Sequence, residues 1–265
     1  MPINRKYGWA PDLPDQRDHL YSAPQPVLAE LPPTKDLRSG CPPVYDQGQL
    51  GSCTANAISG AIQFEQKKQG VTIFGPSRLF IYYNERDMEG TVNSDAGAQI
   101  RDGVKSVATL GVCPETEWPY DINKFADKPM PECYTDATKC EAVGYQRLDS
   151  SNLNQLKGCI ASGFPFVFGF TVYDAFESQE VAKTGVLNMP GPKEKVQGGH
   201  AVLAVGYDDA TQRFTVRNSW GKDWGIEGYF TIPYTYLTTT DLADDFWTIR
   251  ILKASLVTTA QPPAE

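Results

Sequence analysis

The sequence is short of histidine and of long apolar runs, and both shortages narrow its chemistry. Only two of the 265 residues are histidine, His19 and His200. The six cysteines include no pair with the C-x₂-C spacing typical of zinc sites, so we expect neither a metal nor another cofactor. The longest apolar run, Phe164–Val172, is much shorter than the ~18 residues that a membrane-spanning helix needs. We therefore expect a soluble protein without a membrane partner.

Positive charge is also in short supply. The chain has 24 lysine and arginine residues against 32 aspartate and glutamate residues, which gives a formal net charge of −8. This balance argues against nucleic acid as a partner. The segment Met1–Tyr7 lacks the apolar core of a secretory signal. We expect a protein that is cytoplasmic, is exported by a signal-independent route, or has had its signal removed, and the sequence leaves its location unknown.

The segment Asp46–Ala57 carries the strongest functional signal in the chain. It places Cys53 at the first turn of a predicted helix whose apolar residues follow helical spacing until Gly70 ends it. The exposed N–H groups and the positive dipole end of a helix N-terminus favour the thiolate, which is the nucleophilic form of cysteine. A buried structural cysteine is the alternative interpretation. The nearby Gln47 and the small residues before Cys53 count against it.

A nucleophilic cysteine needs a base, and His200 is the candidate. It stands at the start of an apolar run of strand length, and the segment Asn218-Ser219-Trp220-Gly221 follows soon after. Cysteine, then histidine, then Asn-Ser-Trp-Gly is the chain order of the papain-like cysteine peptidases. Over about residues 31–250 this sequence resembles that family, and its bacterial members in particular.

The resemblance implies a role for each residue of the motif. Cys53 would be the nucleophile and His200 the general base and acid, with Asn218 orienting the imidazole. Gln47 and the backbone N–H of Cys53 would hold the oxyanion of the tetrahedral intermediate. Trp220 would shield the hydrogen bond between histidine and asparagine from water.

Candidate substrate-binding residues follow from the same resemblance. Gly97 falls where the family has a glycine-rich strip that pairs with the substrate backbone, although the usual Cys-Asn-Gly-Gly motif is absent. Gly198 and Gly199 would leave the cleft wall open beside the sulfur. Trp224 would line the leaving-group side of the cleft, with an ordinary core tryptophan as the equal alternative.

Two residues beside the nucleophile depart from the family signature Cys-Gly-Ser-Cys-Trp. Leu50 replaces a cysteine that commonly forms a disulfide, and Cys41 could substitute for it. Thr54 replaces a tryptophan beside the cleft, which would reshape the leaving-group side. The family commonly carries disulfides, so we expect a partly oxidised protein. With Cys53 set aside at most two bridges can form, and their pairing stays open among the remaining cysteines, Cys41, Cys113, Cys133, Cys140 and Cys159.

The order of predicted elements indicates an α+β protein, because helical patterns fill the first half of the chain and strand patterns the second. The resemblance implies a two-lobed papain-like fold, with a helical lobe, an antiparallel β-barrel-like lobe and a cleft between them. We expect residues 31–251 to form this peptidase domain. Residues 31–140 would make mainly the helical lobe and residues 141–251 mainly the sheet lobe, with a flexible tail over 252–265.

Residues 1–30 are rich in proline and are expected to form an extended arm. Two interpretations of this arm remain open. It could lie in the cleft as a short inhibitory propeptide, or it could pack as a strand that pins the N-terminus.

Taken together, the residues and the resemblance predict a cysteine endopeptidase, a hydrolase that cleaves peptide bonds through a thiolate–imidazolium pair and an acyl-enzyme. Its partners would be protein or peptide substrates, and we expect a monomer that its arm can hold latent as a zymogen. An acyl-transferring Cys-His enzyme such as a transglutaminase-like protein is a second hypothesis. Those enzymes generally orient the histidine with aspartate, so Asn218 argues against it. A non-catalytic binding protein on the same scaffold is a third, and the complete set of catalytic residues argues against that one.

Overall fold

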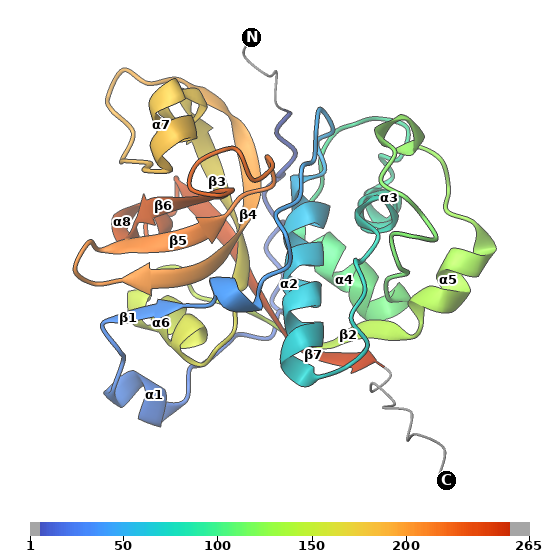
Figure 1. Ribbon diagram of the computed structural model, residues 1–265, viewed down its shortest axis with the longest axis horizontal. Coiled ribbons are helices and arrows are strands. Elements are labelled where there is room, and N and C mark those ends of the chain that lie inside the picture. Colours follow the sequence, from blue (N-terminus) through green and yellow to red (C-terminus); the bar gives the residue numbers. More distant parts are fainter. Residues whose placement is uncertain (1–5, 255–265) are drawn as a thin grey trace, which may run out of the picture.

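The computed structural model describes residues 6–254, which fold into two lobes on either side of a central helix (Figure 1). The helices are α1 (Gln25–Ala29), α2 (Cys53–Gln69), α3 (Arg78–Glu89), α4 (Ile100–Leu110), α5 (Pro131–Ala137), α6 (Leu153–Ala161), α7 (Gln179–Thr184) and α8 (Tyr234–Leu237). The strands are β1 (Thr34–Asp36), β2 (Cys140–Arg147), β3 (Phe166–Tyr173), β4 (Val196–Asp208), β5 (Arg213–Arg217), β6 (Tyr229–Pro233) and β7 (Ala243–Ala254). Within this part of the chain no helix is long and apolar enough to cross a membrane.

The central helix α2 is buried on almost every face, and it begins and ends at the predicted residues. Small residues such as Ala55, Ala57 and Ala61 allow α3 and α4 to approach one side, while β4 and β7 approach the other. Gly70 ends the helix in the left-handed conformation, with φ of 67°, and its N–H bonds to carbonyls of the last turn. Because α2 contacts both lobes, the residue at its first turn lies between them.

The sheet is antiparallel in strand order β2-β7-β3-β4-β5-β6, and β1 pairs with β4. Its core is aromatic. Phe168 stacks on Phe246 with ring centroids 5.3 Å apart, and Phe166 contacts both of them. Strands β4 and β5 are adjacent and pair antiparallel, with Leu203 opposite Arg217, so His200 in β4 and Asn218 just after β5 lie at the same end of the sheet.

The sheet extends beyond the elements that the sequence predicts. Strand β2 was not predicted because residues 140–147 show no clear alternation of apolar and polar residues. It forms the edge of the sheet and contacts α4 and α5 of the helical lobe. The predicted tail must also begin later than residue 252, because Leu252 and Lys253 pair with Ala142 and Glu141 in the ladder of β2 and β7. The remainder of the predicted tail lies outside the described residues.

The N-terminal arm runs between the two lobes (Figure 1). It forms parallel bridges at Trp9 with Ala98 and at Leu20 with Arg147, so it touches both lobes. Asp18 of the arm accepts a charged hydrogen bond from Arg101 at 2.6 Å, and both side chains are almost fully buried. The arm is not extended throughout, since the short helix α1 forms at Gln25–Ala29 with a proline in its first turn.

The aromatic core of the sheet should dominate stability. We expect Phe168→Ala to lower the free energy of unfolding by about 3–5 kcal/mol, because Phe168 is fully buried and its removal leaves a cavity. The measurement is denaturant unfolding followed by circular dichroism. Val143→Ala, at a side chain that is 53% exposed on β2, is the control and should change stability by less than about 0.5 kcal/mol. Equal effects of the two changes would contradict this assignment of the core.

Candidate active site

Cys53 lies at the first residue of α2 and is completely buried. Its Sγ accepts a hydrogen bond from the backbone N–H of Ala201 in β4 at 3.3 Å. Ala201 directly follows His200, so this bond ties the sulfur to the strand that carries the candidate base. Packing of α2 against β4 therefore brings together two residues that are 147 positions apart in the chain.

His200 and Asn218 form the second contact of the site. His200 Nε2 lies 2.8 Å from the Oδ1 atom of Asn218, and both residues are buried. Because Asn218 engages Nε2, proton exchange with a thiol would fall to the other ring nitrogen, Nδ1. Trp220 packs over the imidazole, with ring centroids 5.2 Å apart, and Phe176 contacts both rings. This aromatic surround keeps water from the histidine–asparagine bond.

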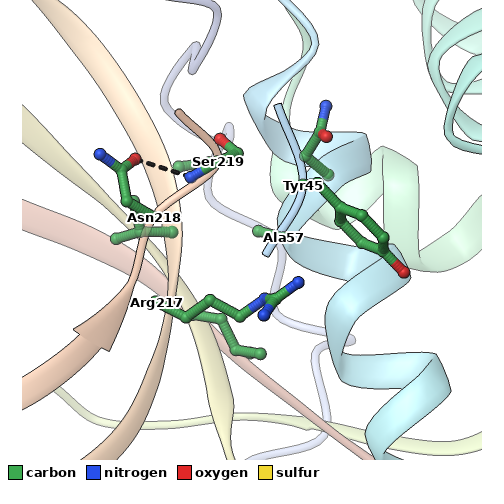
Figure 2. Close-up of a pocket in the computed structure, with 9 residues that line it drawn as sticks. Tyr45, Ala57, Arg217, Asn218 and Ser219 are labelled. Atoms are coloured by element: carbon green, nitrogen blue, oxygen red, sulfur yellow. Dashed lines mark hydrogen bonds between the residues drawn. The ribbon is translucent and has the colours of Figure 1, made fainter. Parts of the chain in front are cut away.

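The end of β5 fixes the position of Asn218. Its backbone N–H donates to Gly228 O at 3.0 Å, and its Oδ1 also accepts the N–H of Ser219 at 2.8 Å. Figure 2 shows this second bond, with Tyr45 and Ala57 on the opposite wall of a small pocket between the lobes. Asn218 is therefore held by Gly228, just before β6, and by the N–H of Ser219, as well as by its contact with the imidazole.

Gln47 is fully buried beside the same residues. Its Oε1 accepts the hydroxyl of Ser219 at 2.6 Å, which aims the amide nitrogen away from that side. The Nε2 atom donates to Leu50 O at 2.9 Å and to Lys6 O of the arm at 3.2 Å. The Gln47 side-chain N–H thus donates to a backbone carbonyl oxygen of the arm, Lys6 O, in the way that an oxyanion donor would bind a substrate carbonyl oxygen.

The arm occupies the cleft directly over the reacting atoms. Lys6 O lies at Gln47, the ring of Tyr7 lies 5.9 Å from that of His200, and the N–H of Gly8 lies near enough to the sulfur of Cys53 to lower its pKa. Gly8 packs so tightly that a Cβ there would lie 1.7 Å from Gly51 O. Of the two interpretations left open for the arm, the structure places these residues in the cleft.

The predicted substrate-binding glycines line this cleft on both sides. Ala98 makes the backbone bonds on one side, accepting from Ala10 N at 3.0 Å and donating to Gly8 O at 2.7 Å. The preceding Gly97 allows this approach, since a Cβ on it would lie 2.1 Å from Gly8 O.

On the other side Gly199 O accepts the N–H of Trp9 at 2.9 Å. Gly198 has the same kind of role as Gly97, because a Cβ on it would lie 2.8 Å from the Cβ atom of Tyr7 and 3.0 Å from its ring. Trp224 packs on Trp220 and Phe176 at the edge of the site, and it does not reach the arm through any described contact.

Trp9 fills a side pocket at Gly169, and sequence reasoning missed the buried acid, Asp245, that contacts it there. The indole packs on Gly169 and Gly199, where added side chains would collide with it. Its Nε1 donates to Asp245 Oδ2 at 2.9 Å, and Asp245 is fully buried. Burial and the neighbouring Asp12 raise the pKa of Asp245 to about 7. The available signal was a pair of aspartates at the start of a predicted strand, where apolar residues are usual.

The pKa of Cys53 is raised, whereas its position at a helix N-terminus predicts that it is lowered. Burial raises the pKa of the thiol to about 11, although hydrogen bonds from the N–H groups of Ala201, Gly8 and Thr54 lower it. The lowering expected at a helix N-terminus assumes access to water, and the arm removes that access. In this closed form Cys53 is a neutral thiol.

The structure places Thr54 differently from expectation, and it does not pair Cys41, the possible substitute for the cysteine that is missing at position 50. Thr54 does not face the leaving-group side, because it is fully buried and its Oγ1 donates to Glu85 of α3 at 2.6 Å. Cys41 donates to Leu37 O at 3.7 Å rather than pairing with another cysteine. The structure contains no disulfide among the six cysteines, and Cys113 interacts with Cys133, so the expected disulfides stay a prediction. Among residues 6–254 there is no cluster of side chains suited to hold a metal ion.

Comparisons with known proteins agree with this geometry. Residues 31–246 match the family model described as papain family cysteine protease. The chain is 40% identical to an uncharacterized peptidase C1-like protein of Acanthamoeba polyphaga mimivirus, covering 98% of this chain and 91% of that one. It is 30% identical to the thiol protease aleurain of Arabidopsis thaliana, over 76% of this chain and 56% of aleurain.

Solved structures confirm the predicted fold. The chain superposes on xylellain, a cysteine protease from Xylella fastidiosa, with a TM-score of 0.86 and 46% identity, covering 94% of this chain and 97% of that one. Procathepsin L 3 of Tenebrio molitor shares the fold at 20% identity, with a TM-score of 0.70 over 93% of this chain and 76% of that one. The predicted resemblance to bacterial members is therefore confirmed. The chain belongs to the papain family of cysteine proteases and is a cysteine endopeptidase with the two-lobed α+β fold of that family.

Proposed function

We propose that this peptidase cleaves peptide bonds through an acyl-enzyme on Cys53 and that its own N-terminal arm holds it latent. The observation that carries the proposal is the path of the arm. Its backbone places a carbonyl at Gln47 and an N–H at the Cys53 sulfur. A peptide backbone in contact with both atoms blocks the positions that a substrate needs.

Each catalytic residue has a defined step in the proposed reaction. The Cys53 thiolate attacks the substrate carbonyl carbon, and the oxyanion is held by Gln47 Nε2 and the Cys53 N–H. The intermediate then collapses as the C–N bond breaks, and the imidazolium of His200 gives its proton to the leaving amine. Water attacks the thioester, His200 takes its proton, and the thiol is released with the carboxylic acid product.

The role of the orienting residue also favours hydrolysis over the acyl-transfer alternative. The neutral side chain of Asn218 holds the imidazole through Oδ1, the position for which acyl-transferring enzymes generally use aspartate. We further propose that the enzyme acts as a monomer on proteins or peptides, without nucleic acid or membrane. Its cytoplasmic or signal-independent exported location remains an expectation from the sequence.

Gln47 provides a direct test of the oxyanion site. We expect Gln47→Ala to lower kcat by about 10²–10³, because one preorganised donor to the transition state is lost. The measurement is hydrolysis of a fluorogenic peptide, expressed per titrated active site. The control is Gln49→Ala, an exposed glutamine two residues along, which should keep its activity. If Gln47→Ala keeps its kcat, the oxyanion assignment is wrong.

The arm is suited to inhibit because it crosses the cleft in the reverse direction. Enzymes of this family usually select a bulky side chain that precedes the cleaved bond by two residues. In the arm the bulky Trp9 lies in the pocket at Gly169, but it follows rather than precedes the carbonyl of Lys6 at the oxyanion donor. The arm therefore fills the substrate positions without presenting its own bonds for hydrolysis.

Displacing the arm should activate the enzyme. We expect Gly8→Ala to raise peptide hydrolysis by full-length protein at least ~10-fold, since only about 1.4 kcal/mol of lost arm affinity suffices for that factor. The added methyl group would lie 1.7 Å from Gly51 O. Alkylation of Cys53 by iodoacetamide near pH 6 should speed up in parallel, because water reaches the thiol and its pKa falls.

Leu13→Ala is the matched control for this change, because the Leu13 side chain is 71% exposed and its backbone bonds remain. It should leave both rates unchanged. Equal activity of wild type, Gly8→Ala and a chain trimmed of residues 1–30 would rule out arm-imposed latency.

The pocket that holds Trp9 suggests which substrates fit once the arm leaves. Departure of the arm removes two donors to Asp245 Oδ2, the indole N–H and the backbone N–H of Asp12. The carboxyl group stays tied to Arg147 at 3.1 Å. We infer that the pocket takes a bulky side chain that carries an N–H donor, rather than a purely apolar one.

Methylation of the substrate indole tests this inference. Peptides with tryptophan two residues before the cut should be cleaved with about tenfold higher kcat/KM than the same peptides with 1-methyltryptophan, since a buried acceptor loses its donor. The same methylation at a tryptophan four residues further from the cut serves as the control and should have no effect. Equal cleavage of both peptides would leave Asp245 without a role in substrate selection.

A further inference from the structure

Thr54, the residue after the nucleophile, is tied to a buried acid of the neighbouring helix. Its Oγ1 donates to Oε1 of Glu85 at 2.6 Å, and both residues have no exposed surface. Thr54 lies in the first turn of α2 and Glu85 in the third turn of α3. This bond is thus a polar link between the helix that carries Cys53 and the rest of the helical lobe.

The Glu85 carboxyl group is tightly enclosed by its neighbours. Its Oε2 has no hydrogen-bond partner among the described residues. A Cβ added to Gly103 of α4 would lie 2.4 Å from that oxygen and 2.5 Å from Ile58 of α2. The carboxyl group is therefore enclosed by α2, α3 and α4, and it fits only because position 103 has no side chain.

The charges that face Glu85 do not stabilise an anion there. Glu89 on α3 and Asp102 on α4 repel a negative charge, while Arg86 attracts one but donates its hydrogen bonds to the carbonyls of Tyr82, Val92 and Ser94. Burial, assisted by the two acids, raises the pKa of Glu85 well above its ordinary value against the opposing effects of Thr54 and Arg86. An ionised carboxylate with one unpartnered buried oxygen would also cost several kcal/mol. The raised pKa and the unpartnered buried oxygen both favour the neutral acid over the carboxylate.

We propose that Glu85 is a positioning residue for catalysis, which fixes Thr54, and through it the neighbouring Cys53, by a hydrogen bond from beneath the first turn of α2. Its neutral state matters as much as its position. A charged Glu85 would raise the pKa of Cys53 and oppose the thiolate, whereas a neutral acid supplies the bond without that cost. The inference rests on the proposed role of Cys53, which Cys53→Ala tests separately by abolishing hydrolysis.

Variants of both partners test the positioning role. Thr54→Val keeps the shape of the side chain but removes the hydroxyl, and it should lower kcat about tenfold or more with KM unchanged, because the nucleophile is less well aligned. Glu85→Ala should do the same, and Glu85→Gln should keep the wild-type kcat since it is neutral and accepts the same bond. Rates are measured on the full-length chain, per titrated active site.

Ser59→Ala is the control on the same helix. Ser59 is fully buried, and its hydroxyl has no partner among residues 6–254. A change there can alter stability but should leave kcat alone. If Thr54→Val keeps its kcat, or if Ser59→Ala lowers kcat as much as Thr54→Val does, the positioning role is overturned.

The pH dependence distinguishes a neutral Glu85 from a charged one. With a neutral acid, Glu85→Gln leaves the acid limb of the kcat/KM profile in place. With a charged one, the substitution removes a repulsive charge and moves that limb to lower pH, which would overturn the neutral state.

Unfolding gives an independent readout that does not need activity. A carboxyl group with a raised pKa in the folded state stabilises the fold fully only below its unfolded pKa, and this contribution is lost as pH rises toward the folded pKa. The urea midpoint of Glu85→Gln should therefore rise relative to wild type between about pH 5 and pH 7. A difference that does not change with pH would show that Glu85 is ionised in the folded protein.

Discussion

The contact between the first turn of α2 and strand β4 is the constraint on which the site depends. The N–H of Ala201 meets the Cys53 sulfur at 3.3 Å, and His200 precedes that N–H by one residue. Strand β5, which pairs with β4, leads directly into Asn218 and Ser219. The hydroxyl of Ser219 in turn orients Gln47 on the other side of the sulfur. A shift of α2 along β4 would therefore disturb the proposed nucleophile, base, orienting amide and oxyanion donor together.

The same closeness underlies the control that we propose for so short an arm. Gly8 reaches the sulfur because both walls of the cleft are lined with residues that lack side chains, among them Gly97, Gly198 and Gly199. Their small size serves a substrate backbone and the arm equally well. Coverage by the arm excludes water, and burial then outweighs the helix N-terminus in setting the pKa of Cys53. The proposed latency is thus an electrostatic effect as well as a steric one.

Local patterns predicted some parts of the fold and the site well and others poorly. Helix α2 was predictable to the residue because its apolar spacing and Gly70 are local signals. Strand β2 was not, since its place at the sheet edge depends on pairing with β7, more than 100 residues later. The hydrogen bond from Thr54 to Glu85 was missed for the same reason. Comparison with the family motif predicted that residue 54 lies beside the cleft. Packing of α2 on α3 instead directs the Thr54 side chain toward the interior of the helical lobe.

By itself the sequence determined the family and the residues with which the reaction is proposed to proceed. Cys53, His200 and Asn218 stand in short motifs whose neighbours are required by the chemistry, so the order along the chain was informative enough. Only the tertiary structure decided what lies against those residues. The arm over the sulfur, the buried Asp245 beneath Trp9 and the buried Glu85 beneath Thr54 all arise from contacts between distant segments. Burial and protonation depend on everything that surrounds a group in space, and no local pattern records that.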